Sequence, residues 1–207
     1  MTIQPRSAAL RYVALGDSYT IGTSVAAAER WPDQLVARLA STARPLDLVA
    51  NLGVDGYTSA DVIRDELPRL GALRPEFASL LVGVNDVVQG VPGERFRANA
   101  EHILAELLGS LPAGGIVAVS TPDYTVTPAG ADYGDPAERA AGIRANNTIL
   151  RELATAREIA WVDIHDLSLR AAGDRALVAA DGLHPSGRQY ALWVERIAPV
   201  VERLLAA

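Results

Sequence analysis

Five short apolar runs alternate along the chain with longer amphipathic segments, and this alternation restricts the fold more than any other feature. The runs cover residues 12–15, 46–50, 77–82, 115–120 and 159–162. Most are nearly continuous apolar stretches rather than alternations of apolar and polar residues, which is typical of strands covered on both faces. Short strands separated by helical segments predict βα units and a parallel sheet.

The segments between these runs carry apolar residues at helical spacing. Trp31, Leu35 and Leu39 recur at every fourth position, and a longer stripe begins at Phe96. Pro32 falls in the first turn of the first of these helices, where proline is tolerated. We therefore predict a helix from Trp31 onward and interpret Trp31 as a core residue.

The length and composition fit one folded unit. The chain has 207 residues, and we expect a single domain of residues 1–207, without repeats, low-complexity tracts or a dividing linker. Apolar residues make up 49% of the chain and charged residues 21%, which argues against intrinsic disorder.

Charge and cysteine content exclude several classes of function. The formal net charge is −6, so nucleic acid is not an expected partner, because binding to phosphates normally needs a basic stripe. The chain has no cysteine, which excludes disulfide frameworks, thiolate zinc sites and cysteine nucleophiles. We find no signal peptide at the start and no long uncharged apolar run. The expectation is a cytoplasmic protein without a stable membrane anchor.

Polar clusters that contain glycine follow the ends of the predicted strands. They cover residues 16–19, 51–58, 83–86 and, before the last helix, 181–185. Each cluster alone has a simple interpretation as a helix cap or a turn. In an open parallel sheet, however, ligands bind beyond the carboxyl ends of the strands. The convergence of these clusters on one edge of the sheet therefore predicts a functional site.

Together the clusters supply the groups that acyl transfer requires. A serine hydroxyl such as that of Ser18 becomes a good nucleophile when a base removes its proton, and histidine titrates near neutral pH. Asp181 and His184 are three residues apart, so a tight turn can aim the carboxylate at one imidazole nitrogen and leave the other for Ser18. The backbone N–H of Gly56 and the side-chain amide of Asn85 can stabilise an oxyanion.

These blocks resemble the GDSL family of esterases and lipases, also called SGNH hydrolases. All four occur in the order typical of that family, and the first block departs from the family name only at Tyr19, where the name has leucine. The resemblance implies a flavodoxin-like α/β fold with three layers (αβα) and a central parallel sheet of about five strands.

The resemblance also implies a role for each of the candidate residues. Ser18 would be the nucleophile, His184 the general base and acid, and Asp181 the carboxylate that orients His184. The implied oxyanion donors are the backbone N–H groups of Ser18 and Gly56 and the side-chain amide of Asn85. No cofactor and no metal ion is expected.

Two further features of the sequence concern the surroundings of the site. Asp17 and Asp86 are expected to hold loops in place by hydrogen bonds rather than to take part in catalysis. The irregular stretch of residues 121–136 follows the fourth predicted strand and should overhang the same sheet edge. We predict that its Tyr124 and Tyr133 bind substrate as a pocket wall, the alternative being an ordinary solvent loop.

The expected activity is hydrolysis of acyl esters of small soluble substrates through an acyl-enzyme intermediate. Thioesters and acetylated sugars are alternative substrates for the same machinery, and the oligomeric state stays open. A metal-dependent phosphoesterase and a non-catalytic binding module are alternatives from other classes, although the three histidines are scattered along the chain. The absence of a P-loop and of a Gly-x-Ser-x-Gly elbow argues against a nucleotide binder and an ordinary α/β-hydrolase.

Overall fold

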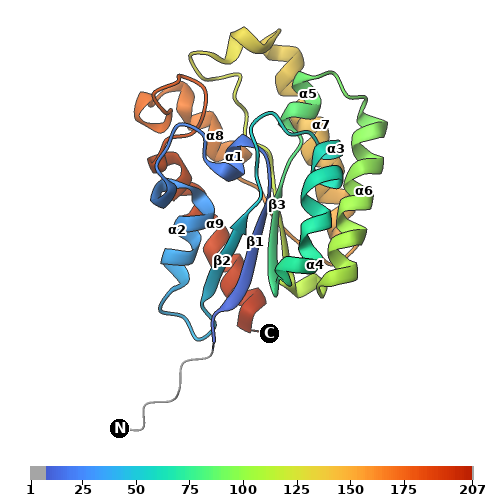
Figure 1. Cartoon of the computed structure of the whole chain (residues 1–207). Coiled ribbons are helices and arrows are strands. Elements are labelled where there is room, and N and C mark those ends of the chain that lie inside the picture. The colour runs from blue at the N-terminus through green and yellow to red at the C-terminus, as the bar shows by residue number, and fades with distance from the viewer. Residues whose placement is uncertain (1–7, 207) are drawn as a thin grey trace.

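The computed structural model describes residues 8–206, and the five predicted strands form one parallel sheet within this range. The strands are β1 (Leu10–Gly16), β2 (Leu46–Asn51), β3 (Phe77–Leu81), β4 (Ile116–Val119) and β5 (Ala160–Val162). Their order across the sheet is β2-β1-β3-β4-β5, as Figure 1 shows. This is the order of a flavodoxin-like fold, and the predicted fold class is confirmed.

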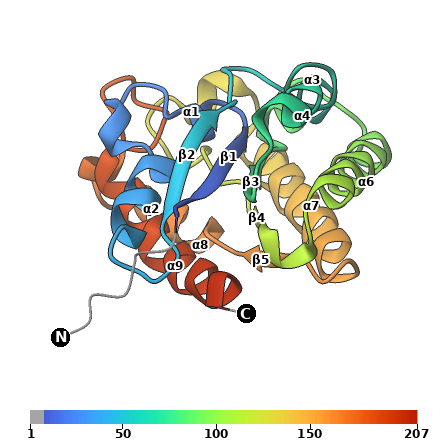
Figure 2. The ribbon, with the colours of Figure 1, turned by 60° about the horizontal axis from the view of Figure 1, so that its bottom comes forward.

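Helices cover both faces of the sheet (Figures 1 and 2). One face is covered by α2 (Trp31–Leu39), α8 (His165–Ser168) and α9 (Gly187–Ala206). The other face is covered by α3 (Ser59–Asp61), α4 (Leu70–Leu73), α6 (Gly93–Ser110) and α7 (Pro136–Thr155). The result is the expected three-layer αβα arrangement, in which the sheet lies between two layers of helices.

Two short helices follow directly after central strands. Helix α1 (Ser18–Ile21) follows β1, and helix α5 (Val84–Val88) follows β3. Both therefore begin at the carboxyl edge of the sheet, where two of the polar clusters were predicted to converge.

Successive residues of the strands are buried on opposite faces of the sheet. Tyr12 and Ala14 of β1 belong to the core beneath α2 and α9, while Val13 and Leu15 belong to the core beneath α6. All four side chains are inaccessible to solvent. This double burial explains why the strands are continuous apolar runs in the sequence.

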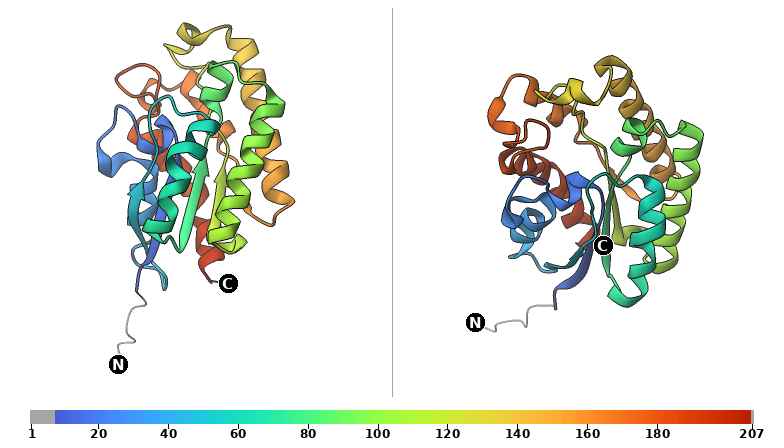
Figure 3. Two further views of the ribbon diagram at one scale, coloured as in Figure 1. Left: turned by 45° about the vertical axis from the view of Figure 1, so that its right-hand side comes forward. Right: turned by 45° about the horizontal axis from the view of Figure 1, so that its top comes forward.

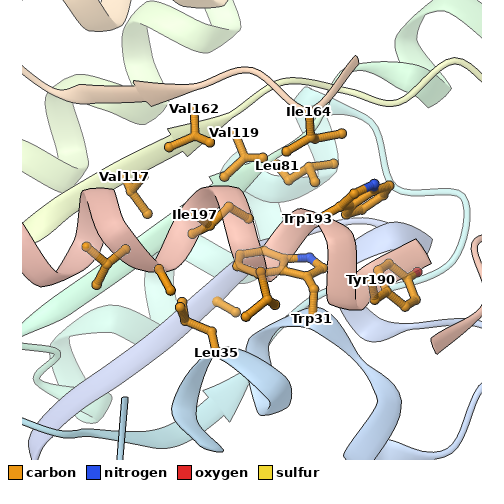
Figure 4. Packing of buried hydrophobic residues seen from close by; sticks show 14 of the residues in the cluster. Trp31, Leu35, Leu81, Val117, Val119, Val162, Ile164, Tyr190, Trp193 and Ile197 are labelled. Carbon is orange, nitrogen blue, oxygen red and sulfur yellow. The ribbon is translucent and has the colours of Figure 1, made fainter. Parts of the chain in front are cut away.

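The core between α2 and α9 is built around two tryptophans, which Figure 4 shows at close range. Trp31 and Trp193 are both fully buried, so the interpretation of Trp31 as a core residue is confirmed. Tyr190 meets Trp193 edge-on, with ring centroids 4.9 Å apart. This packing fixes the start of α9 and therefore the loop of residues 181–185 that precedes it.

Residues 1–7, which belong to the N-terminal segment expected to contain no signal peptide, lie outside the described residues. Among residues 8–206, no helix combines the length and the apolar character that a membrane crossing requires.

Candidate active site

A cavity of about 280 Å³ lies at the carboxyl edge of the sheet, where the clusters after β1 and β3 meet. The strand order reverses between these two strands, and a crevice forms at such a switch point. The residues lining the cavity are Ser18, Tyr19, Asp55, Gly56, Val84, Asn85, Val88, Tyr124, Tyr133, Leu183 and His184. All four predicted clusters and the long loop thus contribute to one cavity.

The turn from β1 into α1 places Ser18 in the lining of this cavity. A Cβ on Gly16 would lie 2.1 Å from the carbonyl oxygen of Leu81, so only glycine allows the ends of β1 and β3 to approach so closely. Asp17 then caps α1, because its Oδ1 accepts a hydrogen bond from the backbone N–H of Tyr19 at 3.0 Å. Ser18 is the first residue of α1 and is 6% exposed.

The turn of residues 181–184 joins an aspartate to a histidine. Oδ1 of Asp181 accepts hydrogen bonds from the backbone N–H groups of Leu183 at 2.9 Å and His184 at 3.0 Å. Oδ2 of Asp181 lies 2.6 Å from Nδ1 of His184. The spacing of three residues thus produces the predicted contact between carboxylate and imidazole.

The structure brings Ser18 and His184 to the same cavity without a direct bond between them. Among residues 8–206, no hydrogen bond joins the Ser18 hydroxyl to the His184 ring. The ring of Tyr19 packs against the imidazole with ring centroids 5.6 Å apart, which limits how far His184 can rotate. Bonds between a nucleophile and its base are often long in the free enzyme and tighten when substrate binds.

Asn85 presents its amide to the cavity from the first turn of α5. Its Nδ2 donates one hydrogen bond to the carbonyl oxygen of Tyr57 at 2.9 Å, which leaves the second amide hydrogen free for another acceptor. Gly56 lines the same cavity with a φ of 79°, a backbone conformation that favours glycine. Gly56 and Asn85 therefore line one cavity with Ser18, and their role as oxyanion donors stays a prediction.

Asp86 anchors α5, as expected for a carboxylate that holds a loop in place. Its two oxygens accept hydrogen bonds from the backbone N–H of Ser59 at 2.9 Å and from the Ser59 hydroxyl at 2.5 Å. Asp86 is inaccessible to solvent, and burial raises the pKa of its carboxyl group. The bonds tie the start of α3 to the helix that carries Asn85.

The loop of residues 121–135 overhangs the sheet edge, as predicted, and Figure 3 shows this yellow segment from two sides. Tyr124 is buried, whereas Tyr133 is 43% exposed, and the two rings meet edge-on with centroids 5.9 Å apart. Nε of Arg139 donates to the carbonyl oxygen of Tyr133, and Nη1 donates to that of Val87 in α5. Arg139 thereby fastens the loop to the helix that carries Asn85.

His165 lies outside the lining of this cavity. It follows β5, and its Nε2 lies 3.7 Å from a carboxylate oxygen of Asp123. Within residues 8–206, no three histidine or acidic side chains are grouped so that they could hold a metal ion.

Sequence reasoning missed Ser24 and Glu66. Ser24 donates a hydrogen bond to Asp181, and Glu66 accepts one from the backbone N–H of Gly16 at 3.0 Å. Neither residue belongs to one of the four clusters, and no local sequence signal marks either of them.

A comparison with protein families finds a match over most of the chain. Residues 14–192 match the model of the GDSL-like Lipase/Acylhydrolase family. No curated protein sequence matched the chain.

Several solved structures share the fold at low sequence identity. A member of the lipolytic G-D-S-L family from Veillonella parvula is 18% identical, with a TM-score of 0.75 over 94% of this chain and 100% of that one. The lipase/acylhydrolase from Enterococcus faecalis is 19% identical, with a TM-score of 0.73 over 94% and 96% of the two chains. An acetylxylan esterase from Geobacillus stearothermophilus is 18% identical, with a TM-score of 0.71 over 98% and 96%.

Two buried acids lie directly behind the Ser18 turn. Burial raises the pKa of Asp17 to about 8 and that of Glu66 to about 9. One oxygen of each carboxyl group, Oδ2 of Asp17 and Oε1 of Glu66, has no hydrogen-bond partner among the described residues. Because an isolated buried charge is costly, both groups favour the neutral acid near pH 7.

The buried Glu66 generates a prediction about the pH dependence of stability. Its pKa in the folded protein lies above that of an unfolded chain, so its contribution is complete below about pH 4.5 and is lost as the pH rises toward about 9. The glutamine of Glu66→Gln cannot ionise. Between pH 5 and pH 9, the free energy of unfolding of this variant should therefore decrease by at least about 1 kcal/mol less than that of the parent protein. Urea denaturation at a series of pH values measures this difference.

The exposed Glu94 offers a matched control for the loss of one carboxylate. Glu94→Gln should keep the pH profile of the parent protein. A Glu66→Gln profile that is parallel to the parent profile would show that Glu66 is ionised in the folded protein at neutral pH.

Proposed function

Because the chain belongs to the GDSL-like lipase/acylhydrolase family, it is an ester hydrolase, and we propose that it cleaves acyl esters of small soluble substrates through an acyl-enzyme at Ser18. The observation that carries this proposal is the 2.6 Å contact between Asp181 and His184 in the turn beside the cavity that Ser18 and His184 line. A metal-dependent phosphoesterase or a non-catalytic binding module would leave this arrangement of Ser18, Asp181 and His184 unexplained.

In the acylation step, Nε2 of His184 removes the proton of Ser18 as Oγ attacks the carbonyl carbon of the ester. The tetrahedral intermediate carries its negative charge on the former carbonyl oxygen. The backbone N–H groups of Ser18 and Gly56 and the amide of Asn85 donate to this oxygen. His184 then gives the proton to the leaving alcohol, and the acyl group stays on Ser18.

In the deacylation step, water takes the place of the alcohol. His184 removes a proton from the water, which attacks the acyl carbon, and the same donors stabilise the second intermediate. Collapse of this intermediate releases the carboxylic acid, and the proton returns from His184 to Ser18. Asp181 stays ionised throughout, stabilises the imidazolium and holds its Nδ1 in the protonated form.

The size and lining of the cavity support a short acyl group. The volume is about 280 Å³, and apolar side chains of Val84, Val88 and Leu183 line it together with two tyrosines. Acetylated sugars and thioesters remain alternative substrates, and a solved structure of similar fold is described as an acetylxylan esterase. A chain-length series of p-nitrophenyl esters, run beside an acyl-CoA and an acetylated sugar, distinguishes these classes.

Ser18→Ala tests the nucleophile. Turnover should fall by several orders of magnitude, because no hydroxyl remains to form the acyl-enzyme. A fluorophosphonate probe should label Ser18 alone, as peptide mass spectrometry would show. The melting temperature should stay that of the parent protein, since the side chain is small. Labelling of another residue, or an active Ser18→Ala protein, would contradict the assignment.

Asn85→Ala tests the oxyanion role. The free amide hydrogen should matter most when negative charge develops, so kcat should fall about 10²–10³-fold with little change in KM. Gln34→Ala is a matched control, because Gln34 donates amide hydrogen bonds to the carbonyl oxygens of Glu29 and Gly187 without lining the cavity. Equal losses in the two variants, or a defect mainly in KM, would show that Asn85 does not stabilise the oxyanion.

Tyr124→Ala and Tyr133→Ala test the pocket wall. Each methylene contact in an apolar pocket is worth about 1–3 kcal/mol, so the relative kcat/KM for long and short esters should change by about 10-fold or more. Tyr124→Phe and Tyr133→Phe keep the ring and should keep the preference of the parent. An unchanged chain-length preference in both alanine variants would mean that the acyl group binds elsewhere.

A further inference from the structure

We infer that Ser24 is a positioning residue for the catalytic aspartate, a role that rests on the proposed function. The Ser24 hydroxyl donates a hydrogen bond of 2.5 Å to Oδ2 of Asp181. The same oxygen lies 2.6 Å from Nδ1 of His184. Ser24 follows α1 in the chain, so this bond joins the segment that carries Ser18 to the turn that carries its base.

The two oxygens of Asp181 have different partners. Oδ1 accepts only from the backbone of its own turn, at Leu183 and His184. Oδ2 receives Ser24 and the imidazole of His184. Among the described residues, Ser24 is thus the one hydrogen-bond donor to Asp181 from outside the turn. Without it, only the imidazole would hold Oδ2 in place.

The backbone of Ser24 supports a role for the side chain. Its φ is 66°, in the left-handed region that glycine occupies without strain and that other residues disfavour. Arg74 and Glu158 are the other non-glycine residues of the described chain with positive φ. A residue held in a disfavoured conformation beside a reactive group points to a function for its side chain. Glycine would adopt this backbone conformation with less strain, but it has no hydroxyl group to donate to Asp181.

The bond also affects the charge of Asp181. Partial burial raises the pKa of this carboxyl group, but the hydrogen bonds from Ser24, Leu183 and His184 outweigh burial and hold the pKa well below its usual range. The carboxylate therefore stays ionised while His184 gains and loses its proton. Ser24 does not line the cavity of about 280 Å³, so it acts through Asp181 and not on the acyl group.

Ser24→Gly separates the hydroxyl from the backbone. The substitution removes the donor and relieves the positive φ, so we expect kcat to fall about 10-fold, KM to stay within about twofold and the melting temperature to stay equal or rise. Glu158→Gly is the matched control: it relieves a φ of 57° at an exposed site just before β5, at the opposite sheet edge. It should keep the kcat of the parent.

A double-mutant cycle with Asp181→Asn gives the decisive readout. If Ser24 acts through Asp181, adding Ser24→Gly to Asp181→Asn should cost no further kcat, because residues that act as a unit are not additive. An equal loss in both backgrounds, or a fully active Ser24→Gly protein, would overturn the role of Ser24 and leave the proposed triad intact. A fully active Asp181→Asn protein would instead overturn the proposed triad itself.

Discussion

The close approach of the carboxyl ends of β1 and β3 determines where the rest of the site can lie. Gly16 has no side chain to keep it from the carbonyl oxygen of Leu81, and its backbone N–H bonds to Glu66. The chain can therefore turn at once into α1 and place Ser18 beside the helix that follows β3. A bulkier residue at this one position would move Ser18 away from Asn85, whatever the remaining residues were.

The residues that line the cavity lie above a layer of three buried acids rather than above an apolar core alone. Asp17, Glu66 and Asp86 are each nearly inaccessible to solvent, and burial raises the pKa of all three. Each of these carboxyl groups accepts a hydrogen bond from a backbone N–H that lies within, or directly beside, one of the four residue clusters that line the cavity. Directional hydrogen bonds restrict the backbone of a loop more tightly than apolar contacts do. The buried acids therefore lower the stability of the fold but hold the loops of the site in position.

Local patterns in the sequence were enough to predict the strands, the parallel sheet and the contact between Asp181 and His184. Each of these depends on residues that are close in the chain, as in the turn of residues 181–184. Ser24 and Glu66 could not be predicted in this way, because their partners lie 157 and 50 residues away along the chain. Their roles depend on which segments the strand order brings together, and periodicity carries no information about that.

Because Arg139 links the loop of residues 121–135 to α5 through main-chain atoms, side chains in the wall of the cavity can be replaced without breaking this link. Arg139 bonds to the main-chain carbonyl oxygens of Tyr133 and Val87, not to their side chains. A substitution of the Tyr133 ring therefore changes the surface that an acyl group would meet but keeps both carbonyl oxygens available. Since Val87 belongs to α5, which also carries Asn85, the loop and the helix stay joined. Under the proposed function, the preference for an acyl group can thus change without moving Asn85, the proposed oxyanion donor.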